Sequence, residues 1–335
     1  MGSRVLVTGG TGFIASWCIV ELLEAGHDVV ASVRAPERER EVRAAVGASD
    51  DARLSFAVAD LTTDAGWDEA ANGCEFVLHV ASPLSAAGDD DGAILAAARD
   101  GTIRILAAAE RAGVRRVVVT SSCAAATPHA TQLTGTVDET CWTDADEPGL
   151  AVYRRSKVLA ERAAWDYVGR DGCMLELTTV LPAAVFGPPR SPSALGSLQI
   201  IAALLDGSAV AIPRLGFEVV DVRDVAHAHV LALTTPAAAG ERFIVSGDVL
   251  WFGEMAGMLR THLGADASRV PTETLTDEDF RAIAQVSPQL ATLLPLLGRS
   301  LQHSSAKARR VLGWQPRPAV ETIVDSAHCI LAAGA

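Results

Sequence analysis

Short runs of β-branched residues alternate with longer Ala- and Leu-rich segments of helical period along the first half of this 335-residue chain. The alternation is typical of a parallel sheet, because parallel neighbours are joined by a crossover, usually a helix, and not by a tight hairpin. We expect strands at residues 4–8, 29–33, 54–58, 76–80, 116–121 and 175–181. We expect the helices between them near residues 12–25, 67–71, 94–112 and 150–169. The pattern predicts an α/β fold with a doubly wound parallel sheet.

The composition and periodicity of the sequence change after Leu181. A stretch rich in Pro, Gly and Ser, PAAVFGPPRSPSALGS, is followed by less regular helices and short strands. We therefore predict a sheet domain over residues 1–181 and a smaller lobe that is formed mainly by residues 182–335, with segments near 218–233 returning to the sheet domain. The cleft between sheet and lobe is the expected ligand site. Residues 275–298 have helical texture and either pack within the lobe or form a flap over the cleft.

Composition narrows the classes of partner. The chain is 49% hydrophobic and 21% charged, so it can bury a large core, and its formal net charge is −13. That negative charge argues against unaided binding to nucleic acid or to an anionic membrane surface. Six scattered cysteines form no C-x-x-C pair, so their spacing predicts no metal site. With no leader-like segment and no apolar run near the length of a membrane span, we expect a cytoplasmic protein whose partner is a small molecule.

A glycine-rich turn joins the first expected strand to the first expected helix, in the stretch VLVTGGTGFIASW. A helix start aims several backbone N–H groups at one point and favours an anion there. Gly9 permits the tight turn, Gly12 lets a pyrophosphate approach the backbone, and the small Ala15 allows the helix to pack closely on the strand. The stretch therefore predicts a phosphate-binding turn.

The spacing of these residues, T-G-x-x-G-F-I-A, resembles the turn of the extended short-chain dehydrogenase/reductase superfamily. The resemblance implies a Rossmann-type fold that binds a dinucleotide across the carboxyl ends of the strands, with a substrate-binding C-terminal lobe. It also implies that the backbone of Phe13 and Ile14 contacts the pyrophosphate.

The choice of cofactor is expected to lie at the end of the second strand. An acidic residue there would bind a ribose with both hydroxyl groups free, but the chain reads VVASVRAPERER. Arg34 at the strand end suits a 2′-phosphate, which predicts NADP(H) as the cofactor. Arg38 and Arg40 either add to this site or form a solvated helix face, since they alternate with glutamates.

Asp60 and Leu61 follow the third expected strand. In relatives of this kind, an Asp carboxylate and the next backbone N–H hold the edge of the adenine. Taken alone, an Asp in this place is also a common helix cap.

The predicted chemistry comes from the segment YRRSK, where Tyr153 and Lys157 are four residues apart and share one face of a helix. An ammonium near a phenol stabilises the phenolate and lowers the pKa of the phenol, so Tyr153 could exchange a proton near neutral pH. Lys157 could also hold the ribose of the nicotinamide. At the end of the fifth strand, VVVTSSCAAA offers a hydroxyl that can bind a carbonyl oxygen. Ser121 and Ser122 are the alternatives, and strand alternation points them in opposite directions. The resemblance to the superfamily pattern implies Ser122 for this role.

Longer segments are similar to the dihydroflavonol reductase and cinnamoyl-CoA reductase-like branch of the superfamily. They are VLHVASPL, GVRRVVVTSS, DETCW, SKVLAERAAWDY, LPAAVFGPP, DVRDVAHAHVLAL and SAKARRVLGWQPRP. The resemblance covers nearly the whole chain. It implies that the cofactor is also lined by residues that follow the fourth and sixth strands, namely Ala81, Ser82, Pro182 and Val185. It implies substrate contacts by Ser82, Pro83, Leu84 and Phe186.

Other polar residues fit structural roles. We expect His79, inside a strand, to be a core histidine. We expect structural roles for Asp221 and Asp224, one near a turn and one as the cap of the helix at 225–233. The chain also departs from both named activities of the branch. GLAVYRRSK replaces the Asn-Trp-Tyr-Cys-Tyr signature of plant cinnamoyl-CoA reductases, and Thr127 or a neighbour replaces an asparagine of many dihydroflavonol reductases.

Together the motifs predict an NADPH-dependent carbonyl reductase in which Tyr153 protonates the oxygen of a ketone or aldehyde. Two alternatives remain open: an NAD-dependent nucleotide-sugar epimerase or dehydratase, which Arg34 disfavours, and a non-catalytic NADP(H)-binding regulator, which the intact Tyr153 and Lys157 disfavour. Pairing of the helices near 94–112 and 150–169 across a two-fold axis would give a homodimer, whereas some members of this branch are monomers.

Overall fold

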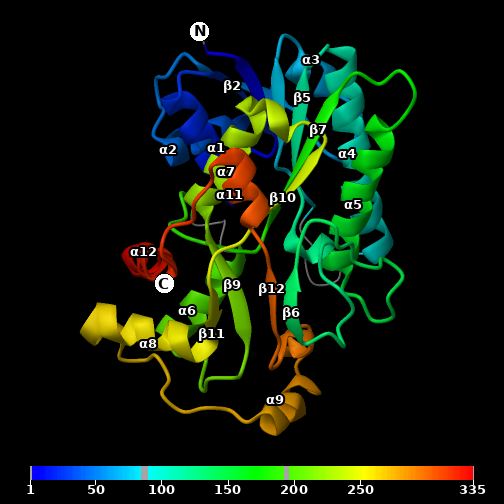
Figure 1. The fold of residues 1–335 in the computed structure, drawn as a ribbon. Helices are drawn as coiled ribbons and strands as arrows, with labels where there is room; N and C mark the ends of the chain where they lie inside the picture. Colours follow the sequence, from blue (N-terminus) through cyan, green and yellow to red (C-terminus); the bar gives the residue numbers. More distant parts are fainter. Residues whose placement is uncertain (1, 84–89, 192–195, 335) are drawn as a thin grey trace.

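A seven-stranded sheet, parallel throughout, forms the centre of the larger part of the molecule in the computed structural model, which describes residues 2–83, 90–191 and 196–334 (Figure 1). Its strand order is β10-β7-β5-β4-β1-β2-β3. The strands are β1 (Arg4–Val7), β2 (Asp28–Val33), β3 (Leu54–Val58), β4 (Phe76–His79), β5 (Arg116–Thr120), β7 (Glu176–Pro182) and β10 (Glu241–Val245). The order reverses between β1 and β4, and ligands of such sheets bind outside the carboxyl ends of the strands at this reversal.

Helices cover both faces of the sheet. One face packs against α1 (Phe13–Glu24), α2 (Glu39–Val46), α7 (Val222–Thr234) and α11 (Ala306–Leu312). The other packs against α3 (Trp67–Ala71), α4 (Asp91–Arg111) and α5 (Val152–Val168). The strands are apolar on both faces, as expected for a sheet that is buried between two helical layers.

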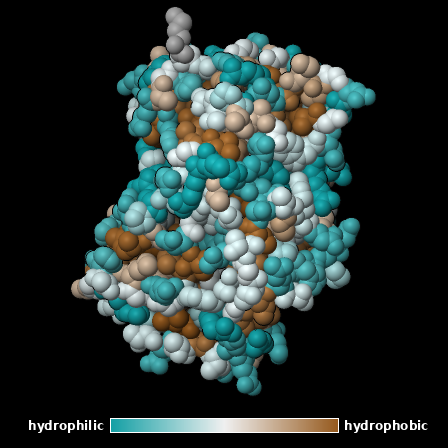
Figure 2. Space-filling view, in the orientation of Figure 1, coloured by the Kyte–Doolittle hydropathy of each residue, from teal (hydrophilic) through white to brown (hydrophobic). Residues whose placement is uncertain are grey.

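The smaller lobe contains two further sheets. One has three strands, β8 (Ala184–Phe186), β9 (Gly216–Asp221) and β11 (Val249–Trp251), and the other pairs β6 (Thr134–Val137) with β12 (Ser300–His303). Its helices are α6 (Gln199–Asp206), α8 (Phe252–Leu263), α9 (Asp277–Ala284), α10 (Pro288–Ala291) and α12 (Ala319–Ala332). They share one hydrophobic core, and Figure 2 shows hydrophobic residues reaching the surface over this lower part of the molecule.

The prediction of an α/β fold with a doubly wound parallel sheet is confirmed. The six predicted strands agree with the structure to within one residue at each end. Strand β10 was not predicted; it pairs with β7 in register from Glu241 opposite Thr178 to Val245 opposite Pro182. Residues 275–298 include α9 and α10, and their leucines pack against the core of the lobe, in agreement with the first of the two interpretations.

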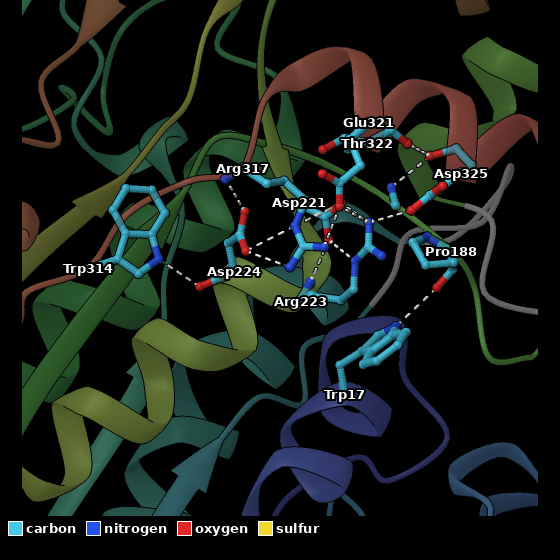
Figure 3. A network of polar contacts seen from close by, with 12 residues as sticks. Trp17, Pro188, Asp221, Arg223, Asp224, Trp314, Arg317, Glu321, Thr322 and Asp325 are labelled. Carbon is cyan, nitrogen blue, oxygen red and sulfur yellow. Dashed lines mark hydrogen bonds and ion pairs between the residues drawn. The ribbon is translucent and has the colours of Figure 1, made fainter. Parts of the chain in front are cut away.

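A network of ion pairs joins the lobe to the sheet layer (Figure 3). Asp221 ends β9, caps α7 by accepting a hydrogen bond from the backbone of Arg223, and also binds the Arg223 side chain at 2.8 Å. Arg223 reaches Asp325 on α12 at 2.8 Å, and Arg317 binds Asp224 on α7 at 2.9 Å. The expected structural roles of the two aspartates are thus observed, and they fix α12 against the start of α7.

The described part of the chain contains no helix that combines the length and the apolar character needed to cross a membrane.

Candidate active site

The glycine turn lies at the centre of the sheet, between β1 and α1. Gly9 has φ +71°, and a Cβ there would lie 3.0 Å from the Cβ of Ala81 in the loop after β4. A side chain at Gly12 would lie 3.1 Å from the carbonyl oxygen of Gly9. The backbone is therefore in a conformation and at a distance that only glycine tolerates easily at position 9. Ala15 is fully buried, as close packing of α1 on the sheet requires.

The N-terminus of α1 is open to a ligand. Gly12 is the N-cap residue and offers no side-chain hydrogen bond, and the first turn of the helix has no acidic residue. The first N–H groups of a helix have no partner within the helix, so those of Phe13 and Ile14 can bind an anion. This is where the sequence predicted the pyrophosphate.

Arg34 directly follows β2 at the same edge of the sheet. Its side chain is exposed and makes no hydrogen bond or ion pair within the described ranges. Arg38 instead pairs with Glu41 at 2.6 Å, which agrees with the interpretation of that residue as part of a solvated helix face. Arg34 and the likewise exposed Arg40 are thus cations that a 2′-phosphate could reach, and Arg34 is the one that directly follows β2.

Asp60 forms a turn after β3. Its Oδ1 accepts hydrogen bonds from the backbone N–H and the hydroxyl of Thr62, at 2.8 and 2.6 Å. These bonds, with a smaller contribution from Arg34, lower the pKa of the carboxyl. The N-cap residue of the next helix is Gly66, so Asp60 is not its cap. Leu61 packs against Gly101 of α4, where an added Cβ would lie 3.0 Å away.

The loop after β4 borders the glycine turn. The backbone N–H groups of Val80 and Ala81 both donate to the Thr8 hydroxyl at 3.0 Å, which ties this loop to β1. Ser82 and Pro83 line a small cavity together with Lys157. Leu84, a predicted substrate contact, lies outside the described residues.

The two serines after β5 point in opposite directions, as strand alternation predicted. Ser121 donates to Glu161 on α5 at 2.6 Å and is 4% exposed. Ser122 caps the short 3₁₀ helix Cys123–Ala125, and its side chain lies close enough to Tyr153 to lower the pKa of that phenol. Ser122 and Tyr153 can therefore contact the same substrate oxygen.

Tyr153 lies in the first turn of α5 with 47% of its surface exposed. Loss of water around its hydroxyl group raises its pKa above the usual value of 10.0, and the hydrogen bond from Ser122 lowers it by less. In the protein alone, the net shift of the Tyr153 pKa is thus upward, and not downward as the spacing of Tyr153 and Lys157 predicts. The Lys157 ammonium lies 6.0 Å from the ring centre, and the exclusion of water is the largest cause of the shift. Tyr153 is therefore protonated at neutral pH and can donate a proton.

Lys157 is buried beneath Tyr153 on the same helix. Its ammonium donates to the carbonyl oxygen of Thr120 at 3.3 Å. Burial lowers its pKa to about 8, while the nearby Glu161 acts in the opposite direction. Lys157 therefore remains largely charged at neutral pH.

Two more predicted residues lie beside the sheet edge. Pro182 ends β7 and is buried, and Val185 in β8 is partly exposed. The predicted substrate contact by Phe186 is not observed, because this side chain is fully buried within the core of the lobe and offers no surface to a substrate. The β8 strand alternates, so a residue next to a cleft-facing position turns inward.

His79 is a core histidine, as predicted. It lies between the hydroxyls of Thr8, at 2.9 Å, and Thr102, at 3.3 Å, and burial lowers its pKa to about 3. A histidine that stays neutral over the physiological range is unsuited to act as a base here.

Two buried residues next to the site were missed. Glu161 accepts hydrogen bonds from Ser121, directly after β5, and from β7 and β10, and His229 on α7 hydrogen-bonds to Thr120 at 2.7 Å. The spacing of Glu161, four residues after Lys157, was a signal that could have revealed it. Within the described ranges, no group of three or more His, Cys, Asp or Glu side chains could hold a metal ion.

The chain is similar in sequence to a known protein family and to named plant reductases. Residues 5–246 match the model of the NAD dependent epimerase/dehydratase family. Cinnamoyl-CoA reductase 1 of Petunia hybrida is 38% identical over 263 residues, 77% of each chain. Dihydroflavonol 4-reductase of Zea mays is 36% identical over 267 residues, which cover 76% of this chain and 73% of the relative.

A similar fold occurs in a solved structure with a bound dinucleotide. Yeast methylglyoxal/isovaleraldehyde reductase Gre2, complexed with NADPH, superposes with a TM-score of 0.83 at 27% identity and covers 99% of both chains.

Proposed function

This chain belongs to the NAD dependent epimerase/dehydratase family, and on that premise we propose that it is an NADPH-dependent reductase of ketones or aldehydes with Tyr153 as the proton donor. The observation that carries the proposal is the meeting of Ser122, Tyr153 and Lys157 at the carboxyl edge of the sheet, beside the glycine turn. The named relatives are reductases, and the yeast structure holds NADPH.

The residues at this edge fit the cofactor. A dinucleotide needs a turn without side chains, and the approach of Ala81 to Gly9 leaves no room for one. It needs free N–H groups for its pyrophosphate, which the uncapped α1 offers. The 2′-phosphate that distinguishes NADPH from NADH needs a cation, and Arg34 is exposed and without a partner among the described residues. NADPH supplies the hydride that reduces the carbonyl carbon.

Three side chains of the protein stabilise and protonate the carbonyl oxygen of the substrate. Ser122 donates a hydrogen bond to that oxygen and stabilises the negative charge that grows on it. Tyr153 gives its hydroxyl proton to the same atom, which its raised pKa makes possible at neutral pH. Lys157 places a positive charge behind the phenol and favours the phenolate that remains.

Replacing Tyr153 by Phe removes the proton and keeps the ring. We expect kcat to fall by about 10²- to 10⁴-fold, as for the loss of a general acid. NADPH affinity should stay nearly unchanged, because the predicted cofactor contacts are made mainly by other residues. NADPH oxidation with a reactive aldehyde measures the first quantity, and quenching of protein fluorescence by NADPH measures the second.

Tyr167 provides the matched control, since it is the second of the two tyrosines in the chain. It is hydrogen-bonded to Glu110 at 2.6 Å, away from Ser122. Tyr167→Phe should retain activity. If Tyr153→Phe turned over at the wild-type rate, or lost NADPH binding together with turnover, the role assigned to Tyr153 would be refuted.

A further inference from the structure

A buried carboxylate lies behind the catalytic residues. Glu161 is on α5, four residues after Lys157, and its side chain is 0% exposed. Its Oε2 accepts a hydrogen bond from Ser121 at 2.6 Å, and its Oε1 accepts one from Thr179 on β7 at 2.8 Å. A charged group without water costs a large free energy, so a carboxylate kept here must be compensated.

Arg242 on β10 supplies the first compensating charge. Its Nε and Nη2 donate to the two carboxylate oxygens of Glu161 at 2.8 and 3.2 Å. Its Nη1 donates to the carbonyl oxygens of Glu139 and Cys141, and the Trp142 ring stacks on the guanidinium at 3.7 Å. The Arg242 side chain is therefore fixed on several sides, and its position fixes that of Glu161.

Lys157 is the second cation near Glu161. Residues four apart on a helix are neighbours, and Lys157 and Glu161 line the same small cavity. Within the part of the chain that the structure describes, the Lys157 ammonium has one hydrogen-bond acceptor, the Thr120 carbonyl at 3.3 Å. One long hydrogen bond to a neutral group is weak compensation for a buried ammonium.

We propose that Glu161 is a positioning residue for the reduction, whose carboxylate keeps the Lys157 ammonium charged and holds in place the strand end that carries Ser122. The second part follows from the bond to Ser121, which directly precedes Ser122. The inference rests on the proposed function, because it assigns the role of Glu161 through residues of that site. Burial lowers the pKa of Lys157 to about 8, and Glu161 acts to raise it, which agrees with this role of the carboxylate.

The charged surroundings of Lys157 come from several elements. On α5 they are Tyr153 and Glu161, on β4 His79, and on β10 Arg242, which acts through Glu161. The residues of α4 and β5 that line the same cavity carry no charge. His79 is neutral above its pKa of about 3, so Glu161 is the anion in this environment.

The composition of the chain allows a direct test. It contains only two lysines, Lys157 and Lys307, so a protein labelled with [13Cε]lysine gives two side-chain signals by NMR. Lys307 pairs with Glu241 at the far side of β10 and serves as the internal reference. The pH dependence of the remaining signal reports the charge of Lys157 without any need for turnover.

Opposite substitutions should move this titration in opposite directions. Glu161→Gln removes the anion, so the midpoint of Lys157 should fall by about one pH unit. Arg242→Gln leaves the anion without its guanidinium, so the midpoint should rise. If Glu161→Gln does not fold, the double variant E161Q/R242Q removes both charges and should still lower the midpoint, because Glu161 is the charge that raises the pKa of Lys157. Unchanged midpoints, or shifts in the same direction, would overturn the proposal, because a purely structural role predicts only a lower melting temperature.

The pH dependence of the reductase activity provides a second test of the role of Glu161. In Glu161→Gln, the alkaline limb of kcat/KM for NADPH-dependent reduction should move to lower pH together with the NMR midpoint. Ser121→Ala breaks a bond to Glu161 without changing charge, so it should lower kcat and leave the limb in place. If the NMR midpoints move as expected but no carbonyl is reduced by the wild type, the proposed function fails and the charge pairing stands.

Discussion

Arg34 is the residue that we propose to select NADPH over NADH. Charge-assisted hydrogen bonds to a phosphate contribute about 1.5–3 kcal/mol, which corresponds to roughly ten- to a hundredfold in affinity. Arg34→Ala should therefore raise KM for NADPH by about that factor and leave KM for NADH nearly unchanged. Initial rates with each cofactor at a fixed carbonyl concentration measure both constants.

Arg38 is the control for this comparison, because its guanidinium already pairs with Glu41. Arg38→Ala should have a smaller effect on NADPH. An equal loss with both cofactors in Arg34→Ala would show that Arg34 supports the turn and does not recognise the 2′-phosphate.

At the residue scale, the motifs predicted which residues lie at the site better than they predicted the solvent exposure and pKa of those residues. The spacing of Gly9, Gly12, Tyr153 and Lys157 placed each residue at the correct edge of the sheet. The direction of the Tyr153 pKa shift could not be read from spacing. It depends on how much water reaches the hydroxyl, and that depends on the packing of segments distant in the sequence.

Helix α7 contains a histidine whose burial makes stability depend on pH. His229 is fully buried, hydrogen-bonds to Thr120 and to the Val225 carbonyl, and has its pKa lowered to about 4. The folded protein keeps it neutral below pH 6.5, whereas the unfolded chain binds a proton there. The free energy of unfolding should therefore fall as the pH drops from about 6.5 to about 4, by about 2 kcal/mol at pH 5 relative to pH 7 for this one group.

Urea unfolding of His229→Asn at pH 7 and pH 5 measures this contribution. The variant should lose about 2 kcal/mol of the wild-type difference between the two pH values. His262→Asn, on the exposed surface of α8, should keep the wild-type difference. If His229→Asn kept it too, the histidine would not be neutral in the folded protein.

At the scale of elements, local pattern predicted the strands that are buried on both faces. Strand β10 was missed because the chain after Leu181 no longer alternates regularly, and because its partner β7 is far away in the sequence. The parallel pair of β6 and β12 joins Thr134 to Ser300, a separation that no local signal records. The partners of Glu161 after β5 and on β7 and β10 could not be predicted for the same reason.

At the scale of the whole molecule, the site lies where two separately packed parts meet. The sheet layer supplies the glycine turn, Ser122 and Tyr153, and the lobe has its own hydrophobic core. The network of Asp221, Arg223 and Arg317 connects the two parts (Figure 3). A bond from the Trp17 indole of α1 to the Pro188 carbonyl at 3.0 Å adds a second connection close to the expected pyrophosphate site. The lobe is thus fixed relative to the cofactor edge, as a reductase needs if the substrate is to meet the cofactor in one geometry.

Reduction of carbonyl compounds with NADPH is measured by following NADPH absorbance with the purified wild-type protein. The substrates are a panel of aldehydes, aryl ketones, β-keto esters and flavanonols. We predict oxidation of NADPH with at least one of them, one equivalent of alcohol formed per NADPH consumed, and a much slower reaction with NADH. No NADPH oxidation with any carbonyl, together with NAD⁺ retained on the purified protein, would refute carbonyl reduction and indicate an epimerase or dehydratase.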